Sequence, residues 1–331
     1  MGTHTINILR KAAGGRPDKF NILTFPTHER YETQLCKTNH NFYSFTGDGI
    51  KNWNENYAPI PDNYHSLPRN SIYQGIRYDF LLVQSKFGQF QAAQAINERI
   101  GVPMIILEHT LPITQLNPEH VEASRGWVGD INVFISEFSR DEWALIGSPQ
   151  TEVIHHSVDT SLFKPSDIEQ SPHVLTVAND FVNRDYCLNY LGWQRITEGI
   201  QTKLVGDTEG LSESAASTEE LVNEYNKAQI FLNTSTLSPI PTSLLEAMSC
   251  GCAVVTTATC MIPEVIKHGE NGMMSNDEEE LRGYIKQLLE DEDLRNKLGA
   301  AARETILSNF SEDEFKNNWN RIFDMAYEVI K

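Results

Sequence analysis

The sequence predicts an α/β protein with two domains, each built on a mostly parallel sheet. The length of 331 residues suits two domains of about 150 residues each. Hydrophobic residues make up 40% of the chain, which is enough for real cores. Short apolar runs alternate with helical patterns from end to end, as in α/β folds. The longest runs, such as Val102–Leu107, are strand-sized and fall far short of the roughly 20 residues that span a bilayer.

In the first half, runs of apolar and β-branched residues predict four strands, at Phe20–Phe25, Phe80–Gln84, Val102–Glu108 and Val133–Ser136. Two helices are predicted between or after them, at Gln89–Ile100 and Arg140–Ile146. The polar stretch Asn52–Asn70, rich in Pro and Asn, is predicted to be a long loop.

In the second half, strands are predicted at Val174–Val177, Lys203–Val205, Ile230–Leu232 and Ala253–Thr256. Helices are predicted at Glu219–Lys227, Thr242–Cys250, Glu278–Glu290, Asp293–Leu307 and Glu312–Ile330. The domain junction falls near Val158–Pro165. We therefore expect one domain at 1–160, completed by about 315–331, and a second at 161–314, with Trp319 packing the last helix onto the first domain.

The net charge of −18 is unevenly spread: residues 1–160 carry −4 and residues 161–331 carry −14. A general nucleic-acid partner, which needs a basic footprint, is disfavoured, although the first half is neutral enough to accept a polyanion locally. The beginning of the chain lacks a long apolar leader, and five scattered cysteines fit a reducing compartment. We expect a cytoplasmic protein with no stable membrane insertion. Cys250-Gly-Cys252 lacks a second ligand pair, so no metal site is expected.

The segment from Pro241 to Gly251 reads as a short helix with start signals at Pro241, Thr242 and Ser243 and a left-handed cap at Gly251. At the end of a parallel strand, the N-terminus of such a helix is a site for a diphosphate, because unpaired N–H groups and the helix dipole favour anions. Glu246 lies about one turn inside and can accept hydrogen bonds from both ribose hydroxyls. The alternative is an ordinary solvated helix carboxylate.

Leu232 to Met273 resembles the donor-binding region of the family 4 retaining glycosyltransferases, which have the GT-B fold. The matching residues, in order, are Glu246-Ala247-Met248, Gly251, Val254-Val255 and Pro263-Glu264-Val265-Ile266. Val153–Asp159 resembles the family's domain junction, and Glu108-His109-Thr110 its histidine-bearing turn. The resemblance implies two Rossmann-like domains facing each other across a cleft, with the C-terminal helix crossing back to the first. It covers about Tyr78 to the C-terminus.

The resemblance implies a nucleotide-diphosphate sugar as donor, UDP being favoured as the commoner base, with Glu246 holding the ribose. Family members neutralise the phosphates with an Arg and a Lys five residues apart. Asn179 and Arg184 occupy those positions here, so one cation is lost and the other is kept. Alternatively, Arg184 pairs with Asp180 or Asp185. The first Glu of the family motif is replaced by Ser238, which indicates an altered donor sugar or lost activity.

In the first half, the resemblance places His109 beside the donor sugar near the reacting carbon; a purely structural turn histidine is the alternative. Thr27 and His28, in the first strand-to-helix turn, are weaker candidates for the acceptor side. Gln84 and Ser85 follow another strand and also qualify for the acceptor side, unless Ser85 simply caps the next helix.

Retaining transfer in this family is thought to pass through an oxocarbenium-like ion pair, with the leaving phosphate taking the acceptor proton. Arg184 and the helix beginning at Thr242 would stabilise the leaving group. The chain has no Asp-x-Asp pair, so metal independence and no cofactor are expected. The favoured acceptor is a hydroxyl of a glycan or small aglycone. Three alternatives are a hydroxylated base in DNA, an inactive nucleotide-sugar-binding protein, and an epimerase or phosphorylase.

Overall fold

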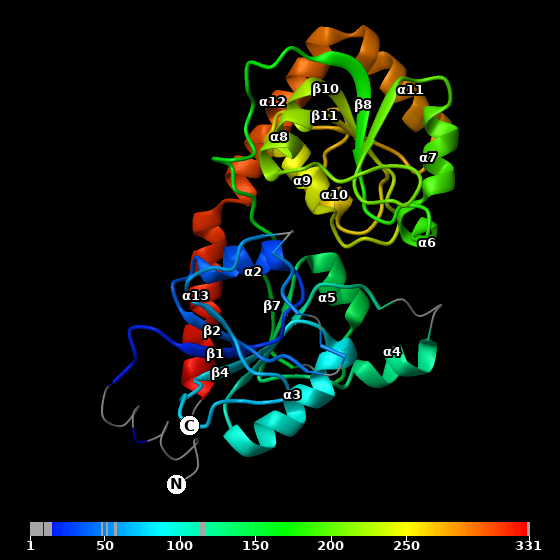
Figure 1. Ribbon diagram of the computed structural model, residues 1–331. Helices are drawn as coiled ribbons and strands as arrows, with labels where there is room; N and C mark the ends of the chain where they lie inside the picture. Colours follow the sequence, from blue (N-terminus) through cyan, green and yellow to red (C-terminus); the bar gives the residue numbers. More distant parts are fainter. Residues whose placement is uncertain are drawn as a thin grey trace. The chain divides into compact units, whose positions relative to one another are not determined.

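A computed structural model describes residues 9, 15–47, 49–50, 52–55, 58–112, 117–147 and 149–329. The chain divides into two compact units (Figure 1). The first, called the N-unit below, comprises Met1–His156 together with Asp313–Lys331. The second, the C-unit, comprises Ser157–Glu312.

The N-unit is built on a parallel sheet with strand order β3-β2-β1-β4-β5-β6-β7. The strands are β1 (Asn21–Thr24), β2 (Asn41–Ser44), β3 (Tyr64–Ser66), β4 (Phe80–Val83), β5 (Met104–Glu108), β6 (Ile131–Phe134) and β7 (Thr151–Val153). The central strands β4, β5 and β6 are buried at every position. Such continuous burial is expected where helices cover both faces of a parallel sheet.

The helices of the N-unit are α2 (Glu29–Cys36), α3 (Lys86–Ile100), α4 (Pro118–Ser124), α5 (Glu137–Trp143) and α13 (Glu312–Val329). Helices α2 and α13 pack on one face of the sheet, and α3 packs on the other. Trp319 of α13 is completely buried, and its indole N–H donates a hydrogen bond to the Tyr31 hydroxyl at 3.0 Å. The expectation that Trp319 packs the last helix onto the first domain is therefore confirmed.

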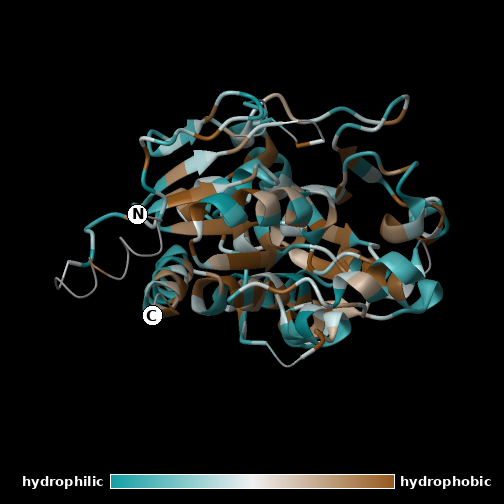
Figure 2. Ribbon diagram, turned by 90° about the horizontal axis from the view of Figure 1, so that it is seen from below, coloured by the Kyte–Doolittle hydropathy of each residue, from teal (hydrophilic) through white to brown (hydrophobic). Residues whose placement is uncertain are grey.

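The C-unit is built on a second parallel sheet with strand order β12-β11-β10-β8-β9. The strands are β8 (Ser171–Val177), β9 (Thr202–Val205), β10 (Ala228–Asn233), β11 (Ala253–Thr256) and β12 (Met273–Met274). The helices are α6 (Asp185–Leu188), α7 (Tyr190–Thr197), α8 (Thr218–Lys227), α9 (Thr242–Ser249), α10 (Ile262–Val265), α11 (Glu278–Glu290) and α12 (Glu292–Asn309). In Figure 2, which views the chain from below, strands with brown, apolar ribbons lie among helices that carry both apolar (brown) and hydrophilic (teal) residues.

Every predicted strand is present within a few residues of its expected range, but two N-unit predictions need correction. The stretch Asn52–Asn70 is not entirely a loop, because Tyr64–Ser66 pairs in register with Phe42–Ser44 as strand β3. The helix predicted at Arg140–Ile146 begins earlier, at Glu137, because the Ser136 hydroxyl accepts a hydrogen bond from the Ser139 N–H and caps it. It ends at Trp143, and the following residue, Ala144, has a left-handed φ of 41°.

Two glycines allow α12 to approach the end of α9 closely. A side-chain carbon at Gly299 would overlap the carbonyl oxygen of Gly251, which itself turns left-handed with φ of 78° just beyond α9, as the sequence predicted. By contrast, a side-chain carbon at Gly283, on the exposed face of α11, would meet nothing within 4 Å. Gly299 of α12 and Gly283 of α11 therefore differ in what they contribute to stability.

We expect Gly299→Ala to destabilise the protein by about 1–3 kcal/mol, because the added methyl group forces the two backbones apart. The matched variant Gly283→Ala should stabilise it by about 0.5–1 kcal/mol through helix propensity alone. Urea unfolding of the wild type and both variants, followed by circular dichroism, measures both effects. Equal stability of the two variants would contradict the close packing of α12 on α9.

Candidate functional site

The candidate donor site lies at one edge of the C-unit sheet, where the parallel strands β8, β10 and β11 all end. In open α/β sheets this carboxyl edge is where ligands bind, because the loops and helix N-termini that follow the strands gather there. Asn233 at the end of β10 is buried, and its side-chain amide donates to the Thr256 hydroxyl at the end of β11 at 2.8 Å. Such bonds hold the strand ends in a fixed arrangement.

Helix α9 begins at this edge. The hydroxyl of Ser243, in its first turn, donates to the carbonyl of Val177, the last residue of β8, at 3.2 Å. The first turn carries no acidic side chain, and no side chain of the described residues caps it. Thr242 and Ser243, both half-buried, therefore lie at an uncapped helix N-terminus, which attracts anions through its N–H groups and dipole.

Glu246 lies one turn inside α9 and is only 6% exposed, so it is not the solvated helix carboxylate of the alternative interpretation. Its Oε2 atom accepts a hydrogen bond of 2.8 Å from the hydroxyl of Tyr225, at the buried face of α8. A buried carboxylate is stabilised by such donors. Tyr225 was not predicted from the sequence, because its aromatic ring at a helical spacing looks like ordinary core.

The loop after β8 carries the predicted cation. Arg184 is exposed and, among the described residues, forms no ion pair. The alternative prediction, an ion pair of Arg184 with Asp180 or Asp185, is not what the structure shows, because both carboxylates accept hydrogen bonds from other groups. Asp180 accepts from the Asn183 amide at 2.7 Å, and Asp185 accepts from the Leu191 N–H at 2.8 Å. The Arg184 guanidinium is therefore available to an anion.

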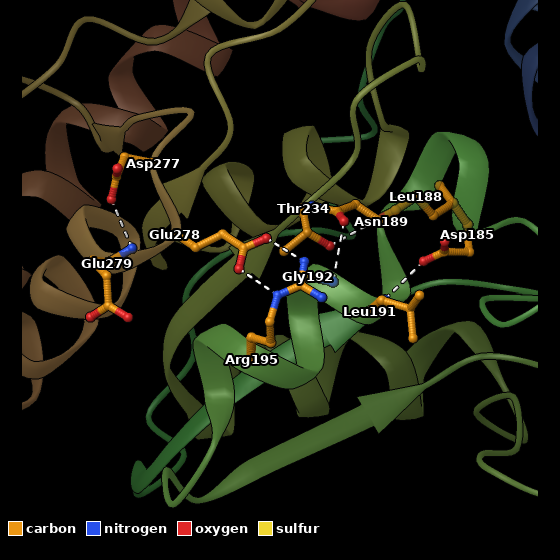
Figure 3. Close-up of polar contacts among 10 residues, drawn as sticks. All are labelled: Asp185, Leu188, Asn189, Leu191, Gly192, Arg195, Thr234, Asp277, Glu278 and Glu279. Atoms are coloured by element: carbon orange, nitrogen blue, oxygen red, sulfur yellow. Dashed lines mark hydrogen bonds and ion pairs between the residues drawn. The ribbon is translucent and has the colours of Figure 1, made fainter.

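The short helices that follow Arg184 are well anchored (Figure 3). Asn189 adopts a left-handed conformation and caps α7 through the Gly192 N–H at 3.2 Å. Thr234, just after β10, donates its hydroxyl to the Leu188 carbonyl at 2.8 Å. Arg195 of α7 binds Glu278 of α11 in a bidentate pair of 2.7 and 2.6 Å. This framework ties the loop with Arg184 to the loop after β10.

Asn179 and Ser238 occupy the two positions where the glycosyltransferase family that the sequence resembles has charged residues. The side-chain amide oxygen of Asn179 accepts a hydrogen bond from the Asp207 N–H at 2.9 Å and so connects the loops after β8 and β9. Ser238 is half-buried in the loop between β10 and α9. That loop is joined to the next by the bond from the Met261 N–H to the Pro239 carbonyl at 3.1 Å. The structure thus gathers the predicted C-unit residues at one edge, with Asn179 in a structural contact.

In the N-unit, His109 follows β5 at the carboxyl edge of the sheet. Its imidazole packs against the edge of the Tyr31 ring, with centroids 4.6 Å apart, and stacks on His156 at 6.1 Å. Its Nε2 atom faces the Gln84 side-chain oxygen at 3.5 Å. Tyr31 and His156 were not identified from the sequence, since they lie 78 and 47 positions from His109 with no local motif to connect them.

The remaining predicted N-unit residues lie in the turns after β1 and β4. Gln84, just after β4, is completely buried. Thr27, after β1, is linked to α3 because its hydroxyl accepts a hydrogen bond from the side-chain amide of Gln89 at 2.8 Å. His28 is exposed and caps α2 through the Tyr31 N–H at 3.4 Å. Ser85 precedes α3 but does not cap it, because its hydroxyl donates to the Phe87 carbonyl at 3.2 Å.

Burial sets the charge of the two stacked histidines, His109 and His156. It lowers the pKa of His109 well below its ordinary value, and the neighbouring His156 and His28 add to the effect. Burial, followed by repulsion from His28 and His155, lowers the pKa of His156 to about 3. Both imidazoles are therefore neutral at pH 7.

Three further features of the described residues bear on the site. No group of three or more His, Cys, Asp or Glu side chains is arranged to hold a metal ion. No helix there is long and apolar enough to cross a membrane. A shallow depression of about 670 Å³ lies along α13, away from the predicted site residues, and is lined by Gln150, Asn317, Asn320, Arg321, Asp324, Met325, Glu328 and Val329.

Comparison with solved structures identifies the class of fold. The chain is similar to sucrose-phosphate synthase from Thermosynechococcus elongatus, with a TM-score of 0.77, 12% identity, and coverage of 94% of this chain and 100% of that one. It is also similar to Anabaena Alr3699/HepE in complex with UDP, with a TM-score of 0.68, 15% identity, and coverage of 93% and 100%. The fold is that of the GT-B glycosyltransferases.

Sequence comparison finds a family match over part of the C-unit. Residues 214–305, which include α9 and Glu246, match the model of the glycosyl transferases group 1. A stretch of 90 residues is 34% identical to N-acetyl-alpha-D-glucosaminyl L-malate synthase of Bacillus anthracis, over 27% of this chain and 23% of that protein. Alpha-maltose-1-phosphate synthase of Mycolicibacterium smegmatis is 22% identical, over 70% of this chain and 73% of that protein.

The depressed histidine pKa values predict an acid-sensitive fold. A folded pKa of about 3 for His156 lies below its unfolded value of about 6.5, so only the unfolded chain gains a proton between these limits. Stability should therefore fall as pH falls from about 6.5 toward 3. We expect His156→Gln to reduce the loss of stability between pH 7.5 and pH 5, measured by urea unfolding at each pH. The same loss in His156→Gln as in the wild type would contradict this assignment. The exposed His65→Gln is the control.

Proposed function

We propose that this protein is a family 4 retaining glycosyltransferase that transfers a sugar from a nucleotide-diphosphate sugar to a hydroxyl acceptor. The observation that carries the proposal is the uncapped N-terminus of α9 at the carboxyl edge of the C-unit sheet, with the buried Glu246 one turn inside it. This arrangement offers an anion site and a ribose acceptor on one short helix. The match to the glycosyl transferases group 1 covers the same helix.

The donor would be held mainly by three groups. The N–H groups at Thr242 and Ser243 would bind the diphosphate, and the Arg184 guanidinium would supply the compensating cation. The Glu246 carboxylate, oriented by Tyr225, would accept both ribose hydroxyls. UDP is the favoured nucleotide, and the similar Anabaena protein has been solved with UDP and with UDP-glucose.

The two departures from the family pattern alter the donor site without removing its basic parts. Ser238 can give the sugar one neutral hydrogen bond, worth about 1 kcal/mol net, against about twice that for a charged acceptor. Asn179 supplies no charge and is engaged with Asp207. We infer that Arg184 and the helix dipole carry the phosphate charge, and that the sugar is recognised with fewer charged contacts than in other family members.

The reaction would break the bond between the anomeric carbon and the diphosphate and form a bond from that carbon to the acceptor oxygen on the same face. The acceptor proton would pass to the leaving phosphate, so no strong protein base is needed. The first turn of α9 and Arg184 would stabilise the negative charge that develops on the leaving group. His109, kept neutral by burial, would orient the sugar, and no metal or other cofactor would take part.

The acceptor is proposed to be the hydroxyl of a glycan or small aglycone. Support comes from the names of the similar proteins, which are synthases of a sugar-linked L-malate, of maltose 1-phosphate and of sucrose phosphate. Thr27 and His28 are the proposed acceptor-side residues. Gln84 and Ser85, also predicted for the acceptor side, make internal hydrogen bonds, as Thr27 and His28 do.

We expect purified protein to release nucleotide from one member of a panel of UDP-, GDP-, ADP- and CMP-sugars, and the correct acceptor to accelerate the release. Arg184→Ala should lower kcat about 10- to 100-fold, because the leaving group loses its cation. Glu246→Gln should raise the KM for the donor. Lys297→Ala, which removes an exposed cation of α12 in the same unit, is the control and should leave kcat unchanged.

The acceptor panel includes glycans, small hydroxyl compounds and hydroxymethylated DNA, so that consumption of donor by DNA alone would replace the proposed acceptor. Nucleotide binding without turnover on any donor would mean that the protein binds nucleotide sugars but does not transfer them. Equal effects of Arg184→Ala and Lys297→Ala would contradict the role of Arg184.

A further inference from the structure

The orientation of the His109 ring is set by a glutamine on the neighbouring strand. A neutral imidazole carries its hydrogen on either Nδ1 or Nε2, and the two tautomers present opposite hydrogen-bonding groups to a ligand. The group that each ring nitrogen faces decides which tautomer is present, because a nitrogen that faces an acceptor must carry the hydrogen. At His109 the partner of Nε2 is the side-chain oxygen of Gln84, at 3.5 Å.

The side-chain amide of Gln84 is fixed in direction. The residue is completely buried at the end of β4, and its Nε2 donates to the Thr24 hydroxyl at 2.9 Å and to the Phe25 carbonyl at 3.3 Å. A carbonyl oxygen can only accept, so the amide nitrogen must face Phe25 and the amide oxygen must face His109. An amide oxygen is likewise only an acceptor, so the facing Nε2 of His109 carries the hydrogen.

The backbone on both sides of His109 is also fixed. Glu108 is buried, and its Oε1 accepts from both the N–H and the hydroxyl of Thr110, at 3.0 and 2.6 Å. Its Oε2 accepts from the Lys86 N–H at 3.1 Å, which joins the turn to the start of α3. The indole N–H of Trp143 donates to the Thr110 carbonyl at 2.8 Å. The turn thus has little freedom to carry His109 away from Gln84.

The titratable groups that face the imidazole are His156, which stacks on it, Tyr31, which meets it edge-on, and His28. None of these is a carboxylate. Burial and the two histidines together lower the pKa of His109, which keeps the ring neutral and makes the choice of tautomer meaningful at pH 7.

We propose that Gln84 is a positioning residue that holds His109 as the neutral tautomer with hydrogen on Nε2, leaving Nδ1 as a hydrogen-bond acceptor for a substrate hydroxyl. Gln84, a predicted acceptor-side residue, acts through His109 and does not itself touch substrate. The part of this inference that concerns substrate rests on the proposed glycosyl transfer. The tautomer itself is a property of the protein alone.

The tautomer is measured by nuclear magnetic resonance of protein labelled with ¹⁵N-histidine, with His109→Gln used to assign the signals. We expect the wild type to show the hydrogen of His109 on Nε2 at pH 7.5. In Gln84→Met, which removes the fixed oxygen, the signals should move toward a mixture of the two tautomers. A wild-type ring with its hydrogen on Nδ1, or an unchanged ring in Gln84→Met, would overturn the proposal.

Activity gives the second test. Gln84→Glu places a carboxylate opposite Nε2, which raises the pKa of His109, so kcat should fall as pH falls through the raised pKa and recover at higher pH. Gln84→Met should lower kcat about 10-fold with no new dependence on pH and little change in the KM for the donor. In the double variant with His109→Ala, the Gln84→Met change should have no further effect. Additive losses would mean that Gln84 does not act through His109.

The control for simple loss of stability is Asn132→Leu. Asn132 is a buried amide of the same sheet, near the amino end of β6, and it bonds the carbonyls of Gly129 and Gln150 at 3.3 and 3.1 Å. The Asn132→Leu variant should lose stability, but the tautomer of His109 and the pH dependence of kcat should stay as in the wild type. If the wild type transfers no sugar, the proposed function fails while the resonance experiment still decides the tautomer, so the two failures are distinguishable.

Discussion

The parallel alignment of the strands in each sheet is the constraint on which both candidate sites depend. Each connection must return the chain to the amino end of the sheet, so all strands of a sheet finish at the same edge. At that edge the backbone leaves the ladder, and side chains of residues distant in sequence come together. Arg184 lies in the connection after β8, and Ser238 and Glu246 lie in the connection after β10, yet all three lie around one sheet edge. Gln84 and His109 meet in the same way in the other unit.

A second constraint is the cost of burying charge where strands end. A lone ionised group in an apolar environment is expensive, and the protein meets this cost with fixed hydrogen bonds. Glu108 receives three such bonds, and Lys86 donates its ammonium to the Ser124 carbonyl at 2.9 Å and lies over the Trp143 ring. Burial still lowers the pKa of Lys86 to about 8. These bonds make the edges rigid, which is what a site that works by positioning requires.

The sequence predicted what is encoded locally and failed where partners are distant. Helix α9, its N-terminal signals and the cap at Gly251 were all predicted, because start residues, helix formers and the glycine are adjacent in the chain. The burial of Glu246 was not, since its partner Tyr225 stands 21 positions earlier on another helix. Strands β2 and β3 were missed because four and three half-polar residues give too little alternation to detect. The fixed amide of Gln84 depends on Thr24 and Phe25, some 60 positions away.

The acidic charge of the second half also bears on how a donor diphosphate could be held. Residues 161–331 contain 28 acidic and 14 basic side chains, a balance that repels an anion at long range. Many of the acids lie in the first turns of α8, α11 and α12, where they stabilise their own helices through the dipole. The first turn of α9 carries none. Exposed charges beyond about 8 Å are screened at physiological salt, so short-range contacts decide the balance at the carboxyl edge. There the uncapped turn and Arg184 supply the positive potential that Asn179 does not.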